Sequence, residues 1–168
     1  MYYLNKKKNN QIKNFENLIK NINYEELYLF VDILIKFNKK NIYFIGIGKS
    51  GNIAIHLSDL FKSISLKTFH LNALNITHGD LGCIDKDDLV IFFSKSGNTK
   101  EILDIIDVFK CYKILICSNQ NAKIKNTVDK TFIVPLDYEC DIYFDLIPSN
   151  SVVNNIIYFN FIFNLYIE

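Results

Sequence analysis

Short runs of consecutive apolar residues constrain the fold of this chain more than any other feature. Residues 42–45, 89–93 and 114–117 are apolar throughout, and shorter patterns of the same kind occupy residues 67–71 and 131–134. A strand that is apolar on both sides must be covered on both faces, which is typical of parallel sheets. The pattern therefore predicts an α/β fold: a three-layer α/β/α sandwich with a mainly parallel five-stranded sheet, of the flavodoxin-like or Rossmann-like kind.

The segments between these runs have helical spacing of apolar residues. Asn23 followed by Glu26 resembles a capping box and predicts a helix through about Phe37. Further helices are expected at residues 53–64 and 99–109 and from Asn150 onward, with short ones at 72–77 and 122–128. We expect one domain over residues 1–168, with N-terminal helices at about 10–40 and a core at about 41–166.

Composition and charge narrow the class of protein. The apolar fraction of 49% and the net charge of +1 indicate a globular chain with no electrostatic reason to bind nucleic acid or a membrane surface. The four cysteines form no C-x-x-C pair, which favours reduced thiols and a cytoplasmic location. No apolar signal segment follows the N-terminus, and asparagines interrupt the apolar stretch at 152–167, so we expect no membrane span.

Two turns follow predicted strands and are the candidate ligand loops. Ser94, Ser96 and Thr99 surround Gly97 in a tight turn between a strand and a helical segment. Such a turn directs hydroxyl and backbone N–H groups to one point, which is typical of a phosphate site. Because the carboxyl ends of parallel strands meet at one edge of a sheet, residues 46–51 are expected beside this turn.

The turn at 46–51 admits a second interpretation. Its pattern Gly46-x-Gly48-x-x-Gly51 matches the dinucleotide fingerprint, but the next strand ends in His70-Leu71-Asn72 without the acidic residue that would bind the ribose. The Walker pattern fails as well, because its first glycine must lie further from the lysine. We favour a glycine turn that brings Lys49 into the same cleft as the serine-rich turn.

Three motifs resemble one known family. The segments Ile45-Gly46-Ile47-Gly48-Lys49-Ser50-Gly51, His78-Gly79-Asp80-Leu81-Gly82 and Ser94-x-Ser96-Gly97-x-Thr99-x-Glu101 are similar, in order and separation, to those of the sugar-isomerase (SIS) domain. Within that family they resemble the arabinose-5-phosphate isomerase branch, in a single-domain form without CBS domains. The resemblance implies interconversion of D-arabinose 5-phosphate and D-ribulose 5-phosphate through a cis-enediol, which supplies 3-deoxy-D-manno-octulosonate and lipopolysaccharide synthesis. It implies a cytoplasmic homotetramer with sites shared between subunits, and no cofactor.

The same resemblance assigns candidate residues. The catalytic candidates it implies are Lys49, His78, Glu101 and Glu139. The substrate-phosphate ligands it implies are Gly48, Ser50, Ser94, Ser96, Gly97 and Thr99. No metal is required, although His78 is also a candidate ligand for an inhibitory divalent ion.

Each catalytic acid or imidazole also has a purely structural interpretation. Glu101 would complement a helix dipole, Glu139 would be a solvated loop acid, and His78 would belong to the loop structure. The alignment around Glu139 is open by a residue or two, with Asp141 as the alternative.

The chain departs from the family pattern in places. It has no match to the His-Pro-Gly-Gly segment that follows the last helix in the family, and Asn98 replaces a common glutamate. These departures leave two other functions open: a non-catalytic SIS module that binds a sugar phosphate, and a different SIS sugar-phosphate isomerase.

Overall fold

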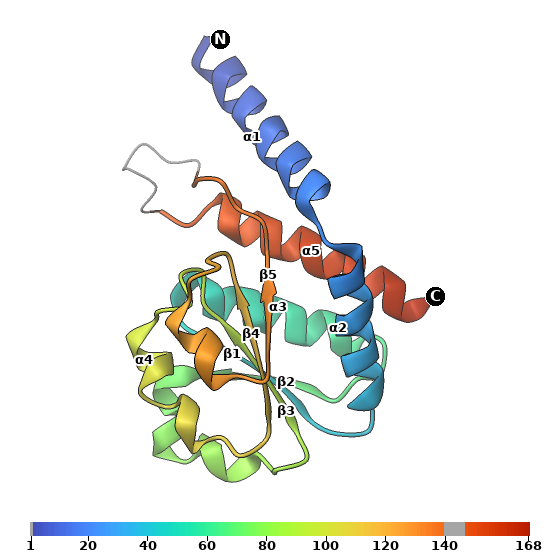
Figure 1. The fold of residues 1–168 in the computed structure, drawn as a ribbon, viewed down its shortest axis with the longest axis vertical. Coiled ribbons are helices and arrows are strands. Elements are labelled where there is room, and N and C mark those ends of the chain that lie inside the picture. Colours follow the sequence, from blue (N-terminus) through green and yellow to red (C-terminus); the bar gives the residue numbers. More distant parts are fainter. Residues whose placement is uncertain (1, 140–146) are drawn as a thin grey trace.

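Five parallel strands form the centre of the molecule, which is a computed structural model describing residues 2–139 and 147–168 (Figure 1). Their spatial order is β2-β1-β3-β4-β5, and every neighbouring pair is parallel. The strands are β1 (Ile42–Gly46), β2 (Thr68–Asn72), β3 (Leu89–Phe93), β4 (Tyr112–Cys117) and β5 (Lys130–Ile133). The predicted fold class is therefore confirmed.

Helices occupy most of the connections. The α-helices are α1 (Tyr2–Asn21), α2 (Tyr24–Lys36), α3 (Gly48–Lys62), α4 (Lys100–Leu103) and α5 (Asn150–Ile167). The 3₁₀ helices are η1 (Ala73–His78), η2 (Asp80–Cys83), η3 (Ile106–Val108) and η4 (Lys123–Thr127). The Asn23 side chain accepts the backbone N–H groups of Glu25 and Glu26, so α2 has the N-cap that the sequence predicts.

The two faces of the sheet are covered differently. Side chains of α2, α3 and α5 pack on one face, where Phe159 of α5 contacts the rings of Phe30, Phe61 and Phe93. Short helical segments, among them η1, α4 and η4, cover the opposite face through residues such as Ile76 and Ile102. Alternate residues of β1, β3, β4 and β5 point to the two faces, so these strands serve both cores.

The predicted helix at residues 99–109 is interrupted. The structure has one turn of α-helix in α4, a 3₁₀ hydrogen bond from the Ile105 N–H to the Ile102 carbonyl, and then η3. Ile102, Ile105 and Phe109 nevertheless remain buried in the same core. The spacing of apolar residues indicates which side chains are buried. It does not distinguish a continuous α-helix from an α-helical turn followed by a 3₁₀ segment.

Helix α1 begins earlier than the expected residue 10 and extends away from the sheet (Figure 1). It is joined to the body by a buried amide pair, in which Asn14 Nδ2 donates to Asn154 Oδ1 at 2.7 Å and Asn154 Nδ2 donates back at 3.3 Å. Asn154 also donates to the Pro135 carbonyl at 2.8 Å. Among the helices described, none is both long and apolar enough to cross a membrane.

Candidate functional site

The two predicted ligand loops emerge side by side from the sheet. Strand β1 pairs with β3, and Gly46 lies opposite Phe93, the last residue of β3. The chain connects β1 to β2 on one side and continues through β3 on the other, so strand order reverses at this point. Ligands of open parallel sheets bind where the order reverses, at the carboxyl ends of the strands.

Glycines allow the first loop to turn tightly into α3. A Cβ on Gly46 would lie 2.8 Å from the Ser50 backbone, and Gly48 has a φ of +57°. Both conditions exclude ordinary side chains. The turn places Lys49 and Ser50 in the first turn of α3, at the edge of the sheet.

The second loop holds its own hydroxyl groups in place. Ser94 Oγ lies 2.7 Å from Thr99 Oγ1 and accepts the Gly97 N–H, while Ser96 Oγ accepts the Asn98 N–H at 3.1 Å. Gly97 has a φ of +61°, and a Cβ there would overlap the Cβ of Ala122. The predicted helix dipole contributes little here, because α4 is a single turn.

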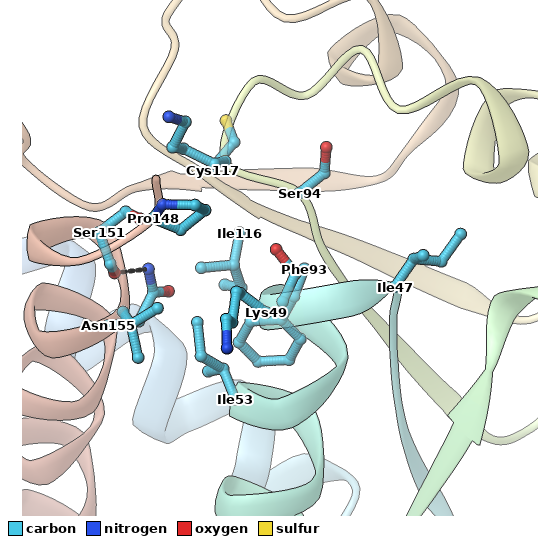
Figure 2. Close-up of a pocket in the computed structure, with 13 residues that line it drawn as sticks. Ile47, Lys49, Ile53, Phe93, Ser94, Ile116, Cys117, Pro148, Ser151 and Asn155 are labelled. Atoms are coloured by element: carbon cyan, nitrogen blue, oxygen red, sulfur yellow. Dashed lines mark hydrogen bonds between the residues drawn. The ribbon is translucent and has the colours of Figure 1, made fainter. Parts of the chain in front are cut away.

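A cavity lies between these loops and the N-terminal end of α5 (Figure 2). Lys49 and Ile53 of α3 line it on one side, Ser151 of α5 lines it on another, and Ser94 belongs to its wall at the loop after β3 (Figure 2). The lining residues are Ile47, Lys49, Ser50, Ile53, Phe93, Ser94, Lys95, Ile116, Cys117, Pro148, Ser151, Val152 and Asn155. Part of the cavity wall therefore carries ammonium and hydroxyl groups, and the rest is mainly apolar.

Glu139 lies directly behind this cavity and is almost fully buried. Its Oε2 accepts the backbone N–H groups of Ser149 at 2.8 Å and Ser151 at 3.0 Å, at the start of α5. Its Oε1 has no hydrogen-bond partner among the described residues and faces Lys95 Nζ at 3.3 Å. The Glu139 side chain is 1% exposed and that of Lys95 is 37% exposed.

The surroundings of Glu139 keep it ionised. Burial acts to raise the pKa of this carboxyl, but hydrogen bonds from Ser151 and Ser149 and the charge of Lys95 outweigh that effect and hold the pKa below its ordinary value. The interpretation of Glu139 as a solvated loop acid is therefore wrong, because the side chain is buried and paired. The alternative residue, Asp141, lies outside the described residues.

The other predicted site residues occupy different positions. Lys49, Ser50 and Ser94 line the cavity, as the adjacent loops lead one to expect. Glu101, in the first turn of α4, and His78, at the end of η1, are exposed and are not among the lining residues. Gly48, Ser96, Gly97 and Thr99 belong to the two loops but do not line this cavity either.

The lining residues that were not predicted from sequence include Lys95, Cys117 and Asn155. Lys95 lies between Ser94 and Ser96 in the predicted phosphate turn. Its position in that turn could have indicated a ligand-binding lysine. Cys117 ends a buried parallel strand, which is also a recognised ligand position. Burial raises the pKa of the Cys117 thiol, so this group is held protonated. Asn155 had no local signal, because its position depends on how α5 packs.

Within the described ranges, no three His, Cys, Asp or Glu side chains gather closely enough to hold a metal ion.

Comparison with known proteins identifies the family. A model of the SIS domain matches residues 37–140. The chain belongs to the SIS domain family. The matched segment of the SIS domain contains both loops and Glu139, and its C-terminal limit precedes α5.

Relatives of this SIS domain include proteins of named activity. The chain is 33% identical over 124 residues to an uncharacterized protein of Chlamydia pneumoniae, a match that covers 72% of this chain and 37% of that protein. It is 40% identical over 80 residues to arabinose 5-phosphate isomerase KdsD of Yersinia pestis, covering 47% and 24% of the two chains. The matches thus span 37% or less of the length of these two curated relatives.

A solved structure matches nearly the whole chain. It is that of Escherichia coli CFT073 c3406 in complex with arabinose 5-phosphate, with a TM-score of 0.82 and 27% sequence identity, covering 99% of this chain and 96% of the other.

Proposed function

We propose that this SIS domain is an aldose–ketose isomerase that interconverts D-arabinose 5-phosphate and D-ribulose 5-phosphate. The observation that carries the proposal is the cavity at the carboxyl ends of β1 and β3, which is lined by Lys49, Lys95 and Ser94 and has the buried Glu139 behind it, paired with Lys95. Cations and hydroxyls suit a phosphorylated sugar, and a carboxylate suits proton transfer. The relative solved with arabinose 5-phosphate and the Yersinia pestis isomerase support the same substrate.

The phosphoryl group is assigned to the loop after β3. Hydroxyls of Ser94, Ser96 and Thr99 and the N–H of Gly97 are its proposed donors, and the Gly48–Ser50 turn faces them from the neighbouring strand. Hydroxyl rotors can redirect their protons from the internal Ser94–Thr99 contact to a bound anion. The phosphate then fixes the position of the five-carbon chain relative to Glu139.

The isomerisation itself requires only proton movements. In the open-chain aldose, a base removes the proton on C2, the electron pair forms the C1–C2 double bond, and the C1 carbonyl oxygen takes up a proton to give the cis-enediol. Loss of the O2 proton and protonation of C1 then give the ketose. The overall reaction needs no external oxidant or reductant. We assign Glu139 to the carbon-bound proton, Lys49 to the developing charge on oxygen, and Glu101 and His78 to ring opening and proton exchange.

The wider context is part of the same proposal. Arabinose 5-phosphate made here would supply 3-deoxy-D-manno-octulosonate for lipopolysaccharide. We propose a cytoplasmic homotetramer whose subunits complete one another's sites.

An isomerase assay on the purified chain tests the proposal. We expect turnover of D-arabinose 5-phosphate, a loss of about a hundredfold in Lys49→Ala, and a smaller loss in Glu101→Gln. A substrate panel that includes hexulose and heptose phosphates separates this activity from other sugar-phosphate isomerases. Turnover that neither substitution alters would overturn the site assignment.

One observation favours a non-catalytic alternative. Of the four proposed catalytic residues, Lys49 alone lines the cavity: Glu139 is buried behind it, and Glu101 and His78 are exposed outside it. A module that only binds a sugar phosphate needs neither of them. Such a module would bind arabinose 5-phosphate in calorimetry and leave its concentration unchanged in the assay.

A further inference from the structure

Two cations line the cavity, and they are held differently. Lys49 is exposed at the start of α3, whereas Lys95 is half-buried and forms an ion pair with Glu139 at 3.3 Å. Lys95 lies between Ser94 and Ser96, so its backbone belongs to the proposed phosphate loop. Its ammonium group therefore connects the phosphate loop to the buried carboxylate.

The two oxygens of Glu139 have unequal partners. Oε2 is satisfied by the N–H groups of Ser149 and Ser151, which belong to the backbone and stay in place. Oε1 is buried, has no hydrogen-bond partner among the described residues, and forms an ion pair with Lys95. One oxygen is thus held by backbone groups, and the other is paired with a side chain on a flexible stem.

A phosphoryl group competes directly for Lys95. A lysine ammonium is a point charge on a flexible four-carbon stem, so it can move without any change in backbone position. A phosphate monoester carries up to two negative charges at neutral pH, against one on Glu139. Because the start of α5 already donates to that carboxylate, a dianion in the loop is the stronger partner for Lys95.

We propose that Lys95 couples ligand binding to Glu139. In the free protein its ammonium pairs with Glu139, and when a phosphate occupies the 94–99 turn the ammonium moves to the phosphoryl oxygens and leaves Oε1 free. The inference rests on the proposed function in giving Glu139 a substrate proton to accept. Lys95 itself acts as a phosphate ligand and a positioning residue.

The consequence is a carboxylate whose proton affinity follows occupancy of the site. A nearby cation favours the ionised form of a carboxyl, so departure of Lys95 raises the proton affinity of Glu139 toward the range useful for a general base. Among the described residues, the charged groups to compare are Lys95 from the loop after β3, Lys49, which lines the same cavity from α3, and Asp137, two residues before Glu139. Of these three, Lys95 is the one in ion-pair contact with Glu139.

The test compares wild type with Lys95→Gln, Lys95→Arg and the control Lys100→Gln. Lys100 is exposed, carries the same charge and lies just beyond the same turn, and it does not line the cavity. Calorimetry with inorganic phosphate measures binding without requiring turnover. We expect Lys95→Gln to weaken phosphate binding about tenfold, Lys95→Arg to retain most of it, and Lys100→Gln to change it little.

The coupling itself is measured by carbon-13 NMR titration of the glutamate carboxyls, with the Glu139 signal identified by its absence in Glu139→Gln. In wild type, saturating phosphate should raise the pKa of Glu139. In Lys95→Gln, the pKa should already be raised without phosphate and should not rise further on binding. A thermal unfolding curve of each variant shows that the compared proteins are folded.

The outcomes separate this inference from the proposed function. Equal phosphate affinity in wild type and Lys95→Gln, or a Glu139 pKa that phosphate does not move, overturns the coupling even if the protein is an isomerase. Absence of phosphate binding in wild type overturns it as well. Lack of isomerase turnover with both effects present overturns the proposed function and leaves the coupling standing.

Discussion

The ligand edge of the sheet has two sides with opposite character. On one side, Lys95, Glu139, Ser149 and Ser151 form a buried set of contacts, here called the Glu139 cluster. On the other side lies an exposed rim of His78, Ser96 and Glu101. A buried carboxylate has a fixed geometry and a pKa set by its neighbours, whereas an exposed one is screened by water and free to rotate. Burial therefore distinguishes the two glutamates more than sequence position does.

The topology explains the difference. Helices α3 and α5 pack on the same face of the sheet, and the cavity opens between their N-terminal ends. Helix α4 packs on the opposite face of the sheet through Ile102. Glu101, in the first turn of α4, is therefore carried with that helix and is exposed to solvent. Two loops that meet at one edge can still send their helices to opposite faces.

The largest expected effect separates the two glutamates. Glu139→Gln should lower kcat/KM about a thousandfold, because it removes the positioned carboxylate, whereas Glu101→Gln should lower it about tenfold. Steady-state assays in both directions measure this. The amide oxygen that replaces Oε2 in Glu139→Gln can still accept the Ser149 and Ser151 N–H groups, so the variant should stay folded and lose at pH 7 only the stability that the ionised carboxylate contributes. A larger loss in Glu101→Gln would reverse the comparison.

Matched glycine substitutions compare the turn after β3 with the motif that contains His78. Gly97→Ala should lower the free energy of unfolding by about 3 kcal/mol, because φ is positive and the new methyl overlaps Ala122. Gly82→Ala, in the motif that follows His78, would place its methyl group where no other atom lies within 4 Å, and it should change stability by less than about 0.5 kcal/mol. Urea unfolding measures both. Equal losses would mean that the two turns are equally constrained.

The buried amide pair connects α1 to α5 and, through Asn154, to Pro135 in the segment before Glu139. Asn14→Ala should lower the free energy of unfolding by about 2 kcal/mol, because it leaves the buried Asn154 amide without one partner. Asn154 also donates a hydrogen bond to the Pro135 carbonyl, in the segment that leads to Glu139. Because a looser segment would position Glu139 less well, kcat should fall together with the free energy of unfolding. Asn9→Ala, on an exposed position of the same helix, is the control. Unchanged stability in Asn14→Ala would show that α1 is not needed to hold this segment.

The smallest expected effect is the pH dependence of stability. The folded-state pKa of Glu139 lies below its unfolded value, so its contribution is present above the unfolded pKa and is lost as pH falls through the folded pKa. Urea unfolding of wild type from pH 7 downward should therefore show a loss that is reduced in Glu139→Gln and retained in Glu101→Gln. An identical pH profile for all three proteins would contradict the pairing described for Glu139.

Much of the fold could be predicted from sequence, because it depends on local patterns. The apolar runs match the strands closely, and Asn23 caps α2 as its spacing to Glu26 indicates. The break after α4 could not be predicted, because Ile102 and Phe109 are buried in either conformation. Lys95 was missed for a different reason. A lysine between two serines looks like a solvated loop residue until its partner is known.

The sequence by itself determined the parallel sheet, the two turns at its ligand edge and the cationic, hydroxyl-bearing character of the site. These follow from strand composition and from the residues within each turn, which act on their immediate neighbours. Only the tertiary structure decided that Glu139 is buried against Lys95 and the start of α5, while Glu101 faces solvent. The physical reason is that burial and charge pairing depend on which distant segments pack together, and no local spacing records that choice.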